Sequence, residues 1–412
     1  MDRLRIAMLA PEFLPNWGGV GTYCIELARH LSKMDGVDLH VFTVRRQTEV
    51  GKGKEFTQAE MEQYFSNKVR VHALMTAKDS FVYNARFQAK LLTALPRFRR
   101  EHGEALVHSQ HAHMSDVLYK TLKPKAWRMP IITTIHTTIA GQRRGIEMCG
   151  SGFGSLHPSE KWQVALYPFL RFAERRSLKG ADRCITVSEW MKKEIASELP
   201  WLKNPVDVIY NGVDPKRYSP EKAKDAELLP DVASPVVLYT SRMTKVKGAD
   251  TLIQAIPKVL REHKGAHFAF AGSKDNEGWI KMLNDAGVGK DKYSFLGYIP
   301  YDQLPALYAR ASVYAMPTLY ENFPFRMLEA MSSGVPVVGS GICGIPEAIE
   351  NGKSGVLAEP RNPELLADGI ISLLGDEKKR RELGARARET VLERFTWGKI
   401  AQQTREAYNK LM

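Results

Sequence analysis

The sequence predicts an α/β protein made of two Rossmann-like domains whose parallel sheets face each other across a cleft. Three observations support this fold class. The chain has 412 residues, which exceeds the size at which one hydrophobic core usually stops growing. Strand-like and helix-like segments alternate along it, an order that favours parallel sheets. A segment rich in proline and charge, residues 211–235, separates two such series.

Each predicted strand is an apolar run that ends at polar or glycine residues. They are residues 5–12, 38–44, 105–111, 130–136 and 183–188 in the first series, and 235–242, 267–273, 293–299, 313–318, 335–340 and 354–359 in the second. We therefore predict an N-terminal domain over residues 1–210, a linker over 211–235, a second domain over 236–390, and a helix within 391–412 that packs back toward the first domain. In such folds the ligand lies in the crevice beyond the carboxyl ends of the strands.

The composition, 44% hydrophobic and 25% charged, is that of an ordinary globular protein. Every apolar run is shorter than the roughly 20 residues needed to cross a bilayer. The amino terminus lacks the order of a secretory leader, so we expect a cytoplasmic protein. The four cysteines, Cys24, Cys149, Cys184 and Cys343, contain no CxxC pair, and we expect buried or half-buried thiols.

The net charge of +13 is concentrated in the first half of the chain. Residues 1–215 hold 31 Lys and Arg against 22 Asp and Glu, while residues 216–412 hold 28 against 24. Residues 86–100 combine five cations with an apolar stripe at helical spacing. This pattern fits a surface helix with one face in the core. It also fits a helix that attaches the protein to an anionic membrane surface, at the inner face of the membrane.

Nucleic acid is not an expected partner. The charge is diffuse, and no segment resembles a zinc finger or an RNP aromatic motif.

The first candidate site is a glycine loop around Gly18 and Gly19, between the first predicted strand and the first predicted helix. Glycines let the backbone approach a ligand and leave the helix N-terminus open to an anion. A tight turn without a ligand would show the same pattern. The loop differs from both the GxGxxG fingerprint and the GxxxxGK[ST] phosphate loop.

The second candidate site follows the first strand of the second series. Arg242 and Lys247 stand at the end of this strand, where a guanidinium and an ammonium together can hold a diphosphate. Lys245 fits a solvated charge. Simple surface cations are the alternative interpretation of the pair.

The third candidate site is a pair of glutamates, Glu321 and Glu329, with seven residues between them. Proline and glycine positions predict a helix from about Pro324 to Ser333, whose N-terminus can bind phosphate. Glu329 is placed to accept hydrogen bonds from ribose hydroxyls, and Glu321 can reach a sugar. The alternative is a helix with one surface acid and one capping acid.

These motifs together resemble glycosyltransferase family four, the large group of retaining enzymes with the two-domain GT-B fold. The resemblance rests on the E-x7-E pair, on Arg242 with Lys247, on Gly18 with Gly19, on His136 at a strand end and on the NGVD string at residues 211–214. It is strongest over residues 236–396 and patchier over residues 45–180.

The resemblance implies an acceptor-binding first domain and a second domain that binds a nucleotide sugar. Gly18 and Gly19 would contact the donor phosphates, Arg242 and Lys247 would neutralise the diphosphate, and Glu329 would hold the ribose. His136 and Glu321 would flank the transferred sugar, so the implied catalytic set is His136, Glu321, Arg242 and Lys247. The backbone near Tyr298 would read the base, and Asn322, Phe323 and Phe325 would complete the donor site. The family more often has Gly-Phe-Gly where this chain has Asn322-Phe323-Pro324, and Pro324 has no N–H to donate.

The implied reaction moves a hexose from a UDP- or GDP-sugar to a glycan or lipid-linked acceptor, with no metal or other cofactor. Retention in the family is usually explained by attack on the face that the diphosphate leaves; a covalent intermediate on Glu321 or His136 is the alternative. Two other functions share the fold: glycogen or starch synthesis and sugar-nucleotide 2-epimerisation. Bacterial glycogen synthases carry a Lys two residues before the paired glycines, where this chain has Asn16.

Overall fold

The computed structural model describes residues 3–14, 18–46, 56–77, 83–150, 152, 156, 158–225, 235–272 and 277–412. It confirms the predicted α/β fold class, because the chain forms two compact units that each contain one parallel sheet. Unit 1 consists of Met1–Ala140, Ala165–Tyr210 and Trp397–Met412, and unit 2 of Gly141–Val164 and Asn211–Thr396. Asn16, and residues 226–234 of the expected linker, lie outside the described residues.

Unit 1 is built on a seven-stranded sheet in the order β3-β2-β1-β4-β5-β6-β7. Its strands are β1 (Leu4–Ala10), β2 (Val37–Arg46), β3 (Val69–Ala77), β4 (Leu106–Gln110), β5 (Ile131–Ile135), β6 (Arg183–Thr186) and β7 (Val206–Val208). Ile6 of β1 lies opposite Leu39 on one side and Leu106 on the other, so β1 is an interior strand of the sheet. Residues 6–10 are all buried, as expected for a parallel strand that is covered on both faces.

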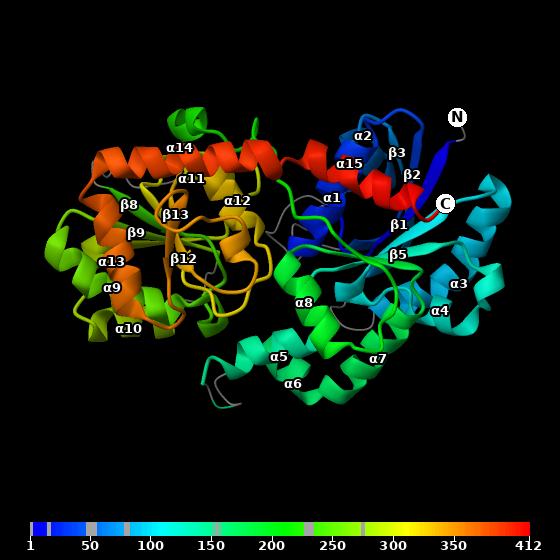
Figure 1. Ribbon diagram of the computed structural model, residues 1–412, viewed down its shortest axis with the longest axis horizontal. Coiled ribbons are helices and arrows are strands. Elements are labelled where there is room, and N and C mark those ends of the chain that lie inside the picture. The colour runs from blue at the N-terminus through cyan, green and yellow to red at the C-terminus, as the bar shows by residue number, and fades with distance from the viewer. Residues whose placement is uncertain are drawn as a thin grey trace. The chain divides into compact units, whose positions relative to one another are not determined.

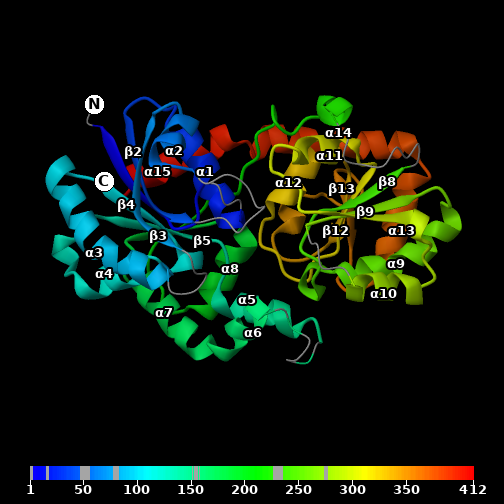
Figure 2. The same ribbon diagram turned by 180° about the vertical axis from the view of Figure 1, so that it is seen from behind.

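Helices cover both faces of this sheet (Figures 1 and 2). The helical elements are α1 (Gly19–Leu31), α2 (Gln58–Tyr64), α3 (Tyr83–His102), η1 (His111–His113), α4 (Val117–Leu122), η2 (Lys125–Trp127), α7 (Tyr167–Lys179), α8 (Glu189–Glu198) and α15 (Trp397–Asn409), together with the start of α5 (Ile139–Glu147). Helices α3, α4 and α7 form one layer, in which α4 packs against both neighbours. The C-terminal α15 packs on α1 in the opposite layer, and the Tyr408 hydroxyl lies 2.7 Å from Nδ1 of the buried His108.

Unit 2 is built on a six-stranded sheet in the order β10-β9-β8-β11-β12-β13. Its strands are β8 (Val236–Tyr239), β9 (His267–Ala271), β10 (Tyr293–Gly297), β11 (Val313–Met316), β12 (Val337–Ser340) and β13 (Gly355–Ala358). The chain reverses direction across the sheet between β8 and β11, which are neighbours. This is the switch point at which open α/β sheets bind ligands.

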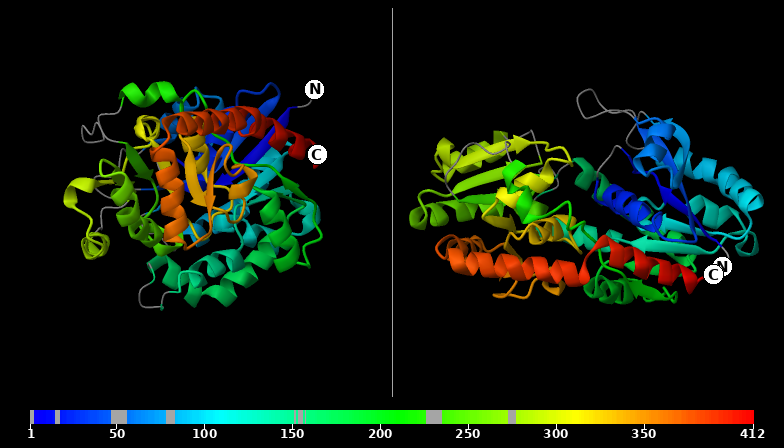
Figure 3. Two further views of the ribbon diagram at one scale, coloured as in Figure 1. Left: turned by 60° about the vertical axis from the view of Figure 1, so that its left-hand side comes forward. Right: turned by 90° about the horizontal axis from the view of Figure 1, so that it is seen from above.

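The helices of unit 2 also form two layers (Figures 1 and 3). The helical elements are α6 (Pro158–Ala165), η4 (Pro220–Asp225), η5 (Lys245–Lys247), α9 (Ala249–Glu262), α10 (Glu277–Asp285), η6 (Lys290–Lys292), α11 (Leu304–Arg310), α12 (Phe325–Ser332), η7 (Ile345–Glu347), α13 (Pro363–Leu374) and α14 (Glu377–Arg394). Helix α9 packs against α10 and α13, while α12 packs against α11 and α14. All four cysteines are buried thiols that form no disulfide, in agreement with the expectation.

The apolar stripe of the basic helix is part of the core of unit 1. The helix predicted around residues 86–100 is α3, and its Phe87, Leu91, Leu95 and Phe98 are buried against the sheet. The prediction that this stripe can insert among lipid headgroups is therefore wrong, because the stripe already packs on the protein. The five cations of residues 86–100 remain exposed.

The helix between the two glutamates starts one residue later than predicted. Pro324 is the N-cap residue, with φ −75° and ψ 133°, and the helix spans Phe325–Ser332. Pro324 fits this place because its fixed φ is compatible with an extended residue and its missing N–H is not needed there.

We expect substitution at Gly384 to destabilise unit 2. A Cβ atom at Gly384 in α14 would lie 2.1 Å from the main-chain oxygen of Gly334, so one of the two backbones must move. Gly384→Ala should lower the free energy of unfolding by about 1–3 kcal/mol, as overpacking does. Gly398→Ala is the matched control, because nothing lies within 4 Å of its Cβ position in α15, and it should be neutral or stabilising by up to about 1 kcal/mol. Thermal unfolding measures both variants, and equal stabilities would contradict the close approach of α14.

Candidate active site

The loop after β8 carries two of the predicted cations. Arg242 is exposed, and Lys247, at the end of η5, keeps 22% of its side chain exposed. The next residue, Gly248, has φ +71°, and a Cβ atom there would lie 1.8 Å from the main-chain oxygen of Pro317. Only glycine tolerates both conditions. The loops that follow the neighbouring strands β8 and β11 are therefore in direct backbone contact.

Hydrogen bonds from buried hydroxyl groups hold this loop in position. The Tyr239 hydroxyl donates to the main-chain oxygens of Arg242, at 3.0 Å, and Lys247, at 3.3 Å. The Thr240 hydroxyl lies 2.7 Å from that of Tyr308 and 3.1 Å from that of Tyr314. Because these side chains are buried, their hydrogen bonds fix the course of the loop and hence the positions of the two cations.

The loop after β11 brings Glu321 to Lys247. The main-chain N–H of Leu319 and the Thr318 hydroxyl both donate to the main-chain oxygen of Val246, at 2.8 and 3.2 Å. This contact places the Glu321 carboxylate against the ammonium of Lys247, and the two form an ion pair. Three of the residues predicted to be catalytic, Arg242, Lys247 and Glu321, thus lie in one part of unit 2.

A third cation, Arg326, belongs to the same cluster and was missed by the sequence analysis. Arg326 is exposed in the first turn of α12, which contains no acid. A cation at a helix N-terminus is unfavourable, because the positive end of the helix dipole lies there. Arg326 lies between Glu321 and Glu329 in the sequence, at a helix start where a cation is unfavourable. This position is the signal from which Arg326 could have been predicted.

The pKa of Lys247 reflects both its burial and the repulsion from the neighbouring cations. Burial, followed by the charges of Arg242 and Arg326, lowers the pKa of Lys247 to about 7, despite the ion pair with Glu321. A bound anion would favour the charged form of Lys247. The cluster can therefore bind a group with several negative charges, such as a diphosphate.

The second glutamate lies deeper than the first. Glu329 is only 6% exposed, in the second turn of α12. Burial raises the pKa of its carboxyl, although Arg326 and the hydroxyls of Tyr308 and Tyr218 act in the opposite direction. Only a small part of this residue is therefore accessible to a ligand.

The remaining predicted donor residues of unit 2 differ in exposure. Asn322 and Phe323 are buried, Phe325 is half-buried at the start of α12, and Tyr298, directly after β10, is 57% exposed. The Asn211 side chain donates to the main-chain oxygen of Phe323, at 2.6 Å. The NGVD segment therefore supports the loop that carries Glu321.

The predicted residues of unit 1 lie at the carboxyl edge of its sheet. Gly18 is the N-cap residue of α1, and Gly19 is the first residue of that helix. His136 directly follows β5, and its Nε2 lies 2.9 Å from Oε1 of Gln110, at the end of β4. Because an amide oxygen only accepts, Nε2 carries the proton. The ring also meets Tyr23 of α1 edge to face, with centroids 4.7 Å apart.

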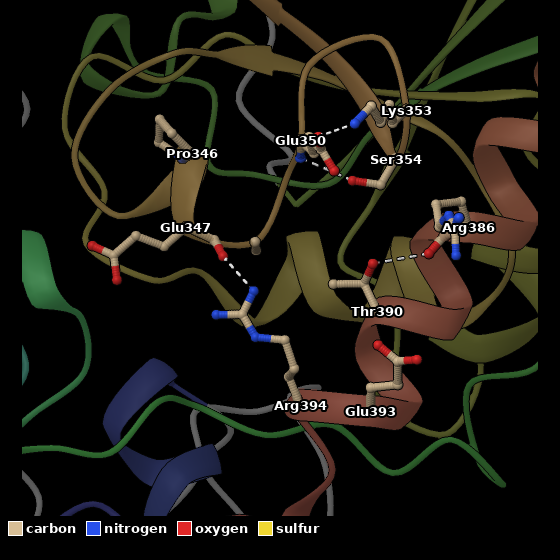
Figure 4. A pocket seen from close by; sticks show the side chains of 10 residues that line it. Pro346, Glu347, Glu350, Lys353, Ser354, Arg386, Thr390, Glu393 and Arg394 are labelled. Atoms are coloured by element: carbon tan, nitrogen blue, oxygen red, sulfur yellow. Dashed lines mark hydrogen bonds and ion pairs between the residues drawn. The ribbon is translucent and has the colours of Figure 1, made fainter.

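A pocket on unit 2 contains none of the predicted residues (Figure 4). It lies between η7 and α14, and its charged groups largely contact one another: Lys353 pairs with Glu350 at 2.5 Å, and Arg394 donates to the main-chain oxygen of Glu347 at 3.1 Å. These contacts satisfy the polar groups within the protein, so the pocket does not indicate a ligand.

Within the described ranges, none of the helices has the length and apolarity that crossing a bilayer requires.

Two family models match successive parts of the chain. The model described as Glycosyltransferase Family 4 matches residues 17–217, and the one described as Glycosyl transferases group 1 matches residues 220–390. Between them they extend over both units.

Individual proteins match all or part of the chain. An uncharacterised glycosyltransferase of Methanocaldococcus jannaschii is 29% identical over 99% of each chain. A GDP-mannose-dependent phosphatidylinositol monomannoside mannosyltransferase of Mycobacterium tuberculosis is 32% identical over 58% of this chain and 64% of its own length. Among solved structures, sucrose-phosphate synthase from Thermosynechococcus elongatus has a TM-score of 0.78 at 22% identity, and covers 99% of both chains. Anabaena HepE in complex with UDP and glucose has a TM-score of 0.71 at 20% identity, over 99% of this chain and all of HepE.

The pKa of Lys247 predicts that binding of a diphosphate ligand depends on pH. Below pH 7 the ammonium is already charged, whereas above pH 7 a proton must be taken up on binding. Affinity for a nucleotide sugar, whose phosphates stay ionised, should therefore fall between pH 7 and 8.5, by up to about tenfold per pH unit. Titration calorimetry in two buffers of different ionisation enthalpy measures both the affinity and the proton uptake.

Lys247→Arg is the control for this titration, because a guanidinium stays charged over the whole range. Its affinity should be nearly independent of pH. The same pH dependence in the wild type and in Lys247→Arg would show that another group titrates.

Proposed function

The chain belongs to the group 1 glycosyltransferases of family 4, and we propose that it moves a hexose from a UDP- or GDP-sugar to a glycan or lipid-linked acceptor with retention of configuration. The observation that carries the proposal is the cluster of Arg242, Lys247 and Arg326 beside the N-terminus of α12. Cations and main-chain N–H groups at that place match the charge of the diphosphate in a nucleotide sugar.

The names of the similar proteins support the choice of donors. The mycobacterial relative is GDP-mannose-dependent, and HepE is described with UDP and glucose. In the proposed complex, the segment at Tyr298 contacts the base, Glu329 the ribose, and Asn322, Phe323 and Phe325 form the wall behind the diphosphate.

The cluster would act on the leaving group. When the bond between the sugar and the diphosphate breaks, negative charge grows on the departing oxygen, and prepositioned cations stabilise it at little reorganisation cost. Arg242 and Lys247 take this role. Glu321 orients Lys247 through their ion pair and faces the sugar from the donor side.

Retention follows if the acceptor attacks the face that the diphosphate leaves. The acceptor hydroxyl then gives its proton to the departing phosphate oxygen while the new glycosidic bond forms. Gly18 and Gly19, at the start of α1, contribute main-chain N–H groups toward the phosphates. His136 contributes a hydrogen bond to the transferred sugar, with its ring held by Gln110.

A screen of UDP-, GDP- and ADP-sugars for released nucleotide, with and without acceptor extracts, tests the proposal. Arg242→Ala and Lys247→Ala should each reduce turnover by roughly two to three orders of magnitude, the effect of losing one group that stabilises developing charge. Lys245→Ala is the matched control, because this exposed lysine precedes Lys247 by two residues, and its turnover should stay within about threefold of wild type.

Two results would reject the proposal. Unchanged turnover in both Arg242→Ala and Lys247→Ala would remove the cluster from the reaction. Donor turnover that yields an isomerised sugar, without any acceptor, would instead make the protein an epimerase.

We also expect transfer to be independent of divalent metal ions, since the cations and the helix N-terminus can supply the charge stabilisation that a bound metal gives elsewhere. Rates measured with excess EDTA should match untreated rates within about twofold. Loss of transfer in EDTA, with recovery on addition of magnesium or manganese, would refute this part of the mechanism.

A further inference from the structure

One face of unit 1 exposes large apolar side chains that its core does not use. The face is the outer side of the layer formed by α3, α4 and α7, turned away from the sheet (Figures 1 and 2). Four apolar side chains on these helices and on the adjoining η2 are more than half exposed: Leu122 (59%), Trp127 (74%), Phe169 (65%) and Phe172 (63%). Burial of such side chains is favourable, and several of them on one face of a protein can mark a surface that binds a partner or a membrane.

Helix α7 carries aromatic and cationic side chains on one side. Phe169, Phe172, Arg176 and Lys179 follow one another at intervals of three, four and three residues, so they share one side of the helix. All four are exposed. The acid of this helix, Glu174, is buried on the other side, where it accepts from the main-chain N–H of Ile139 at 2.9 Å. The outer side of α7 therefore carries aromatic rings and cations without an acid.

The rest of the layer adds positive charge. The five cations of residues 86–100 in α3 are exposed. Of the acids nearby, Glu101 pairs with Arg97 at 2.7 Å, and Asp182 pairs with Lys125 of η2 at 3.0 Å. Lys120 of α4 does not contribute, because it is buried with Asp116. The layer thus carries a surplus of exposed cations in addition to the exposed aromatic side chains.

We propose that the outer face of α3, α4 and α7 docks on an anionic lipid bilayer. Exposed aromatic side chains next to cations match the interface of a bilayer, where rings lie at the level of the headgroups and cations meet phosphates. A protein partner would instead fit an apolar patch that is continuous and has a polar rim. The inference extends the proposed function, since docking would bring a lipid-linked acceptor to the enzyme, but it does not depend on the donor chemistry.

Co-sedimentation with vesicles tests the inference on the full-length protein. Vesicles of phosphatidylcholine alone are compared with vesicles that also contain phosphatidylglycerol. Wild-type protein should bind the anionic vesicles and lose binding at high salt, because screening weakens contacts to headgroups. Phe169→Ala with Phe172→Ala, and separately Arg176→Glu with Lys179→Glu, should each lower the partition coefficient by roughly tenfold or more.

The charge-matched control is Lys281→Glu with Lys290→Glu, two exposed lysines of unit 2, which should bind vesicles like the wild type. Donor turnover without vesicles should be unchanged in all of these variants, so a failure of the glycosyl-transfer proposal would be seen separately. Equal binding to neutral and anionic vesicles, or α7 variants that bind as well as the control, would overturn the inference. Absence of any binding would also overturn it and favour a protein partner for this face.

Discussion

The candidate site of unit 2 depends on holding like charges close together. Arg242, Lys247 and Arg326 come from the loop after β8 and from the first turn of α12. Burial, together with the proximity of the other two cations, depresses the pKa of Lys247. Such an arrangement costs free energy in the empty protein, and Glu321 offsets only part of it. The polypeptide keeps the cations in place through contacts that are independent of charge: Gly248 against Pro317, and buried tyrosine and threonine hydroxyls below the loop.

This arrangement explains how a common α/β sheet can carry the candidate active site without unusual secondary structure. Strands β8 and β11 are neighbours at the point where the chain reverses direction, so the loops that follow them meet at one edge. One loop supplies Arg242 and Lys247, and the other supplies Glu321 and the start of α12. Unit 1 also carries its predicted site residues at the carboxyl edge of its sheet. There α1 begins, and Gln110 holds the ring of His136 by a hydrogen bond.

Much of this was predictable from the sequence, because parallel strands leave apolar runs and strand ends leave polar residues. The two parallel sheets, and the position of α12 within one residue at each end, follow from such patterns. The edge strands β3 and β7 of unit 1 were not among the predicted strands, and the ion pair of Lys247 with Glu321 was not predicted. Two further features were not foreseen. The sequence of α3 fits both a core-facing helix and a membrane-attached one, since amphipathicity does not reveal whether the apolar side meets a sheet or a bilayer. Arg326 was missed because its role in the cluster depends on Lys247 and Arg242, which are 79 and 84 residues away in the sequence.

The central claim is that the cation cluster exists to bind a diphosphate. Calorimetric titration with the nucleoside diphosphate and the nucleoside monophosphate of the same base tests it most directly, since the two ligands differ by a single phosphate. The account predicts that the diphosphate binds at least tenfold more tightly, as expected when a phosphate meets charge-assisted donors, and that Lys247→Ala removes most of this preference. Equal affinities for the two nucleotides, or an unchanged preference in Lys247→Ala, would contradict it.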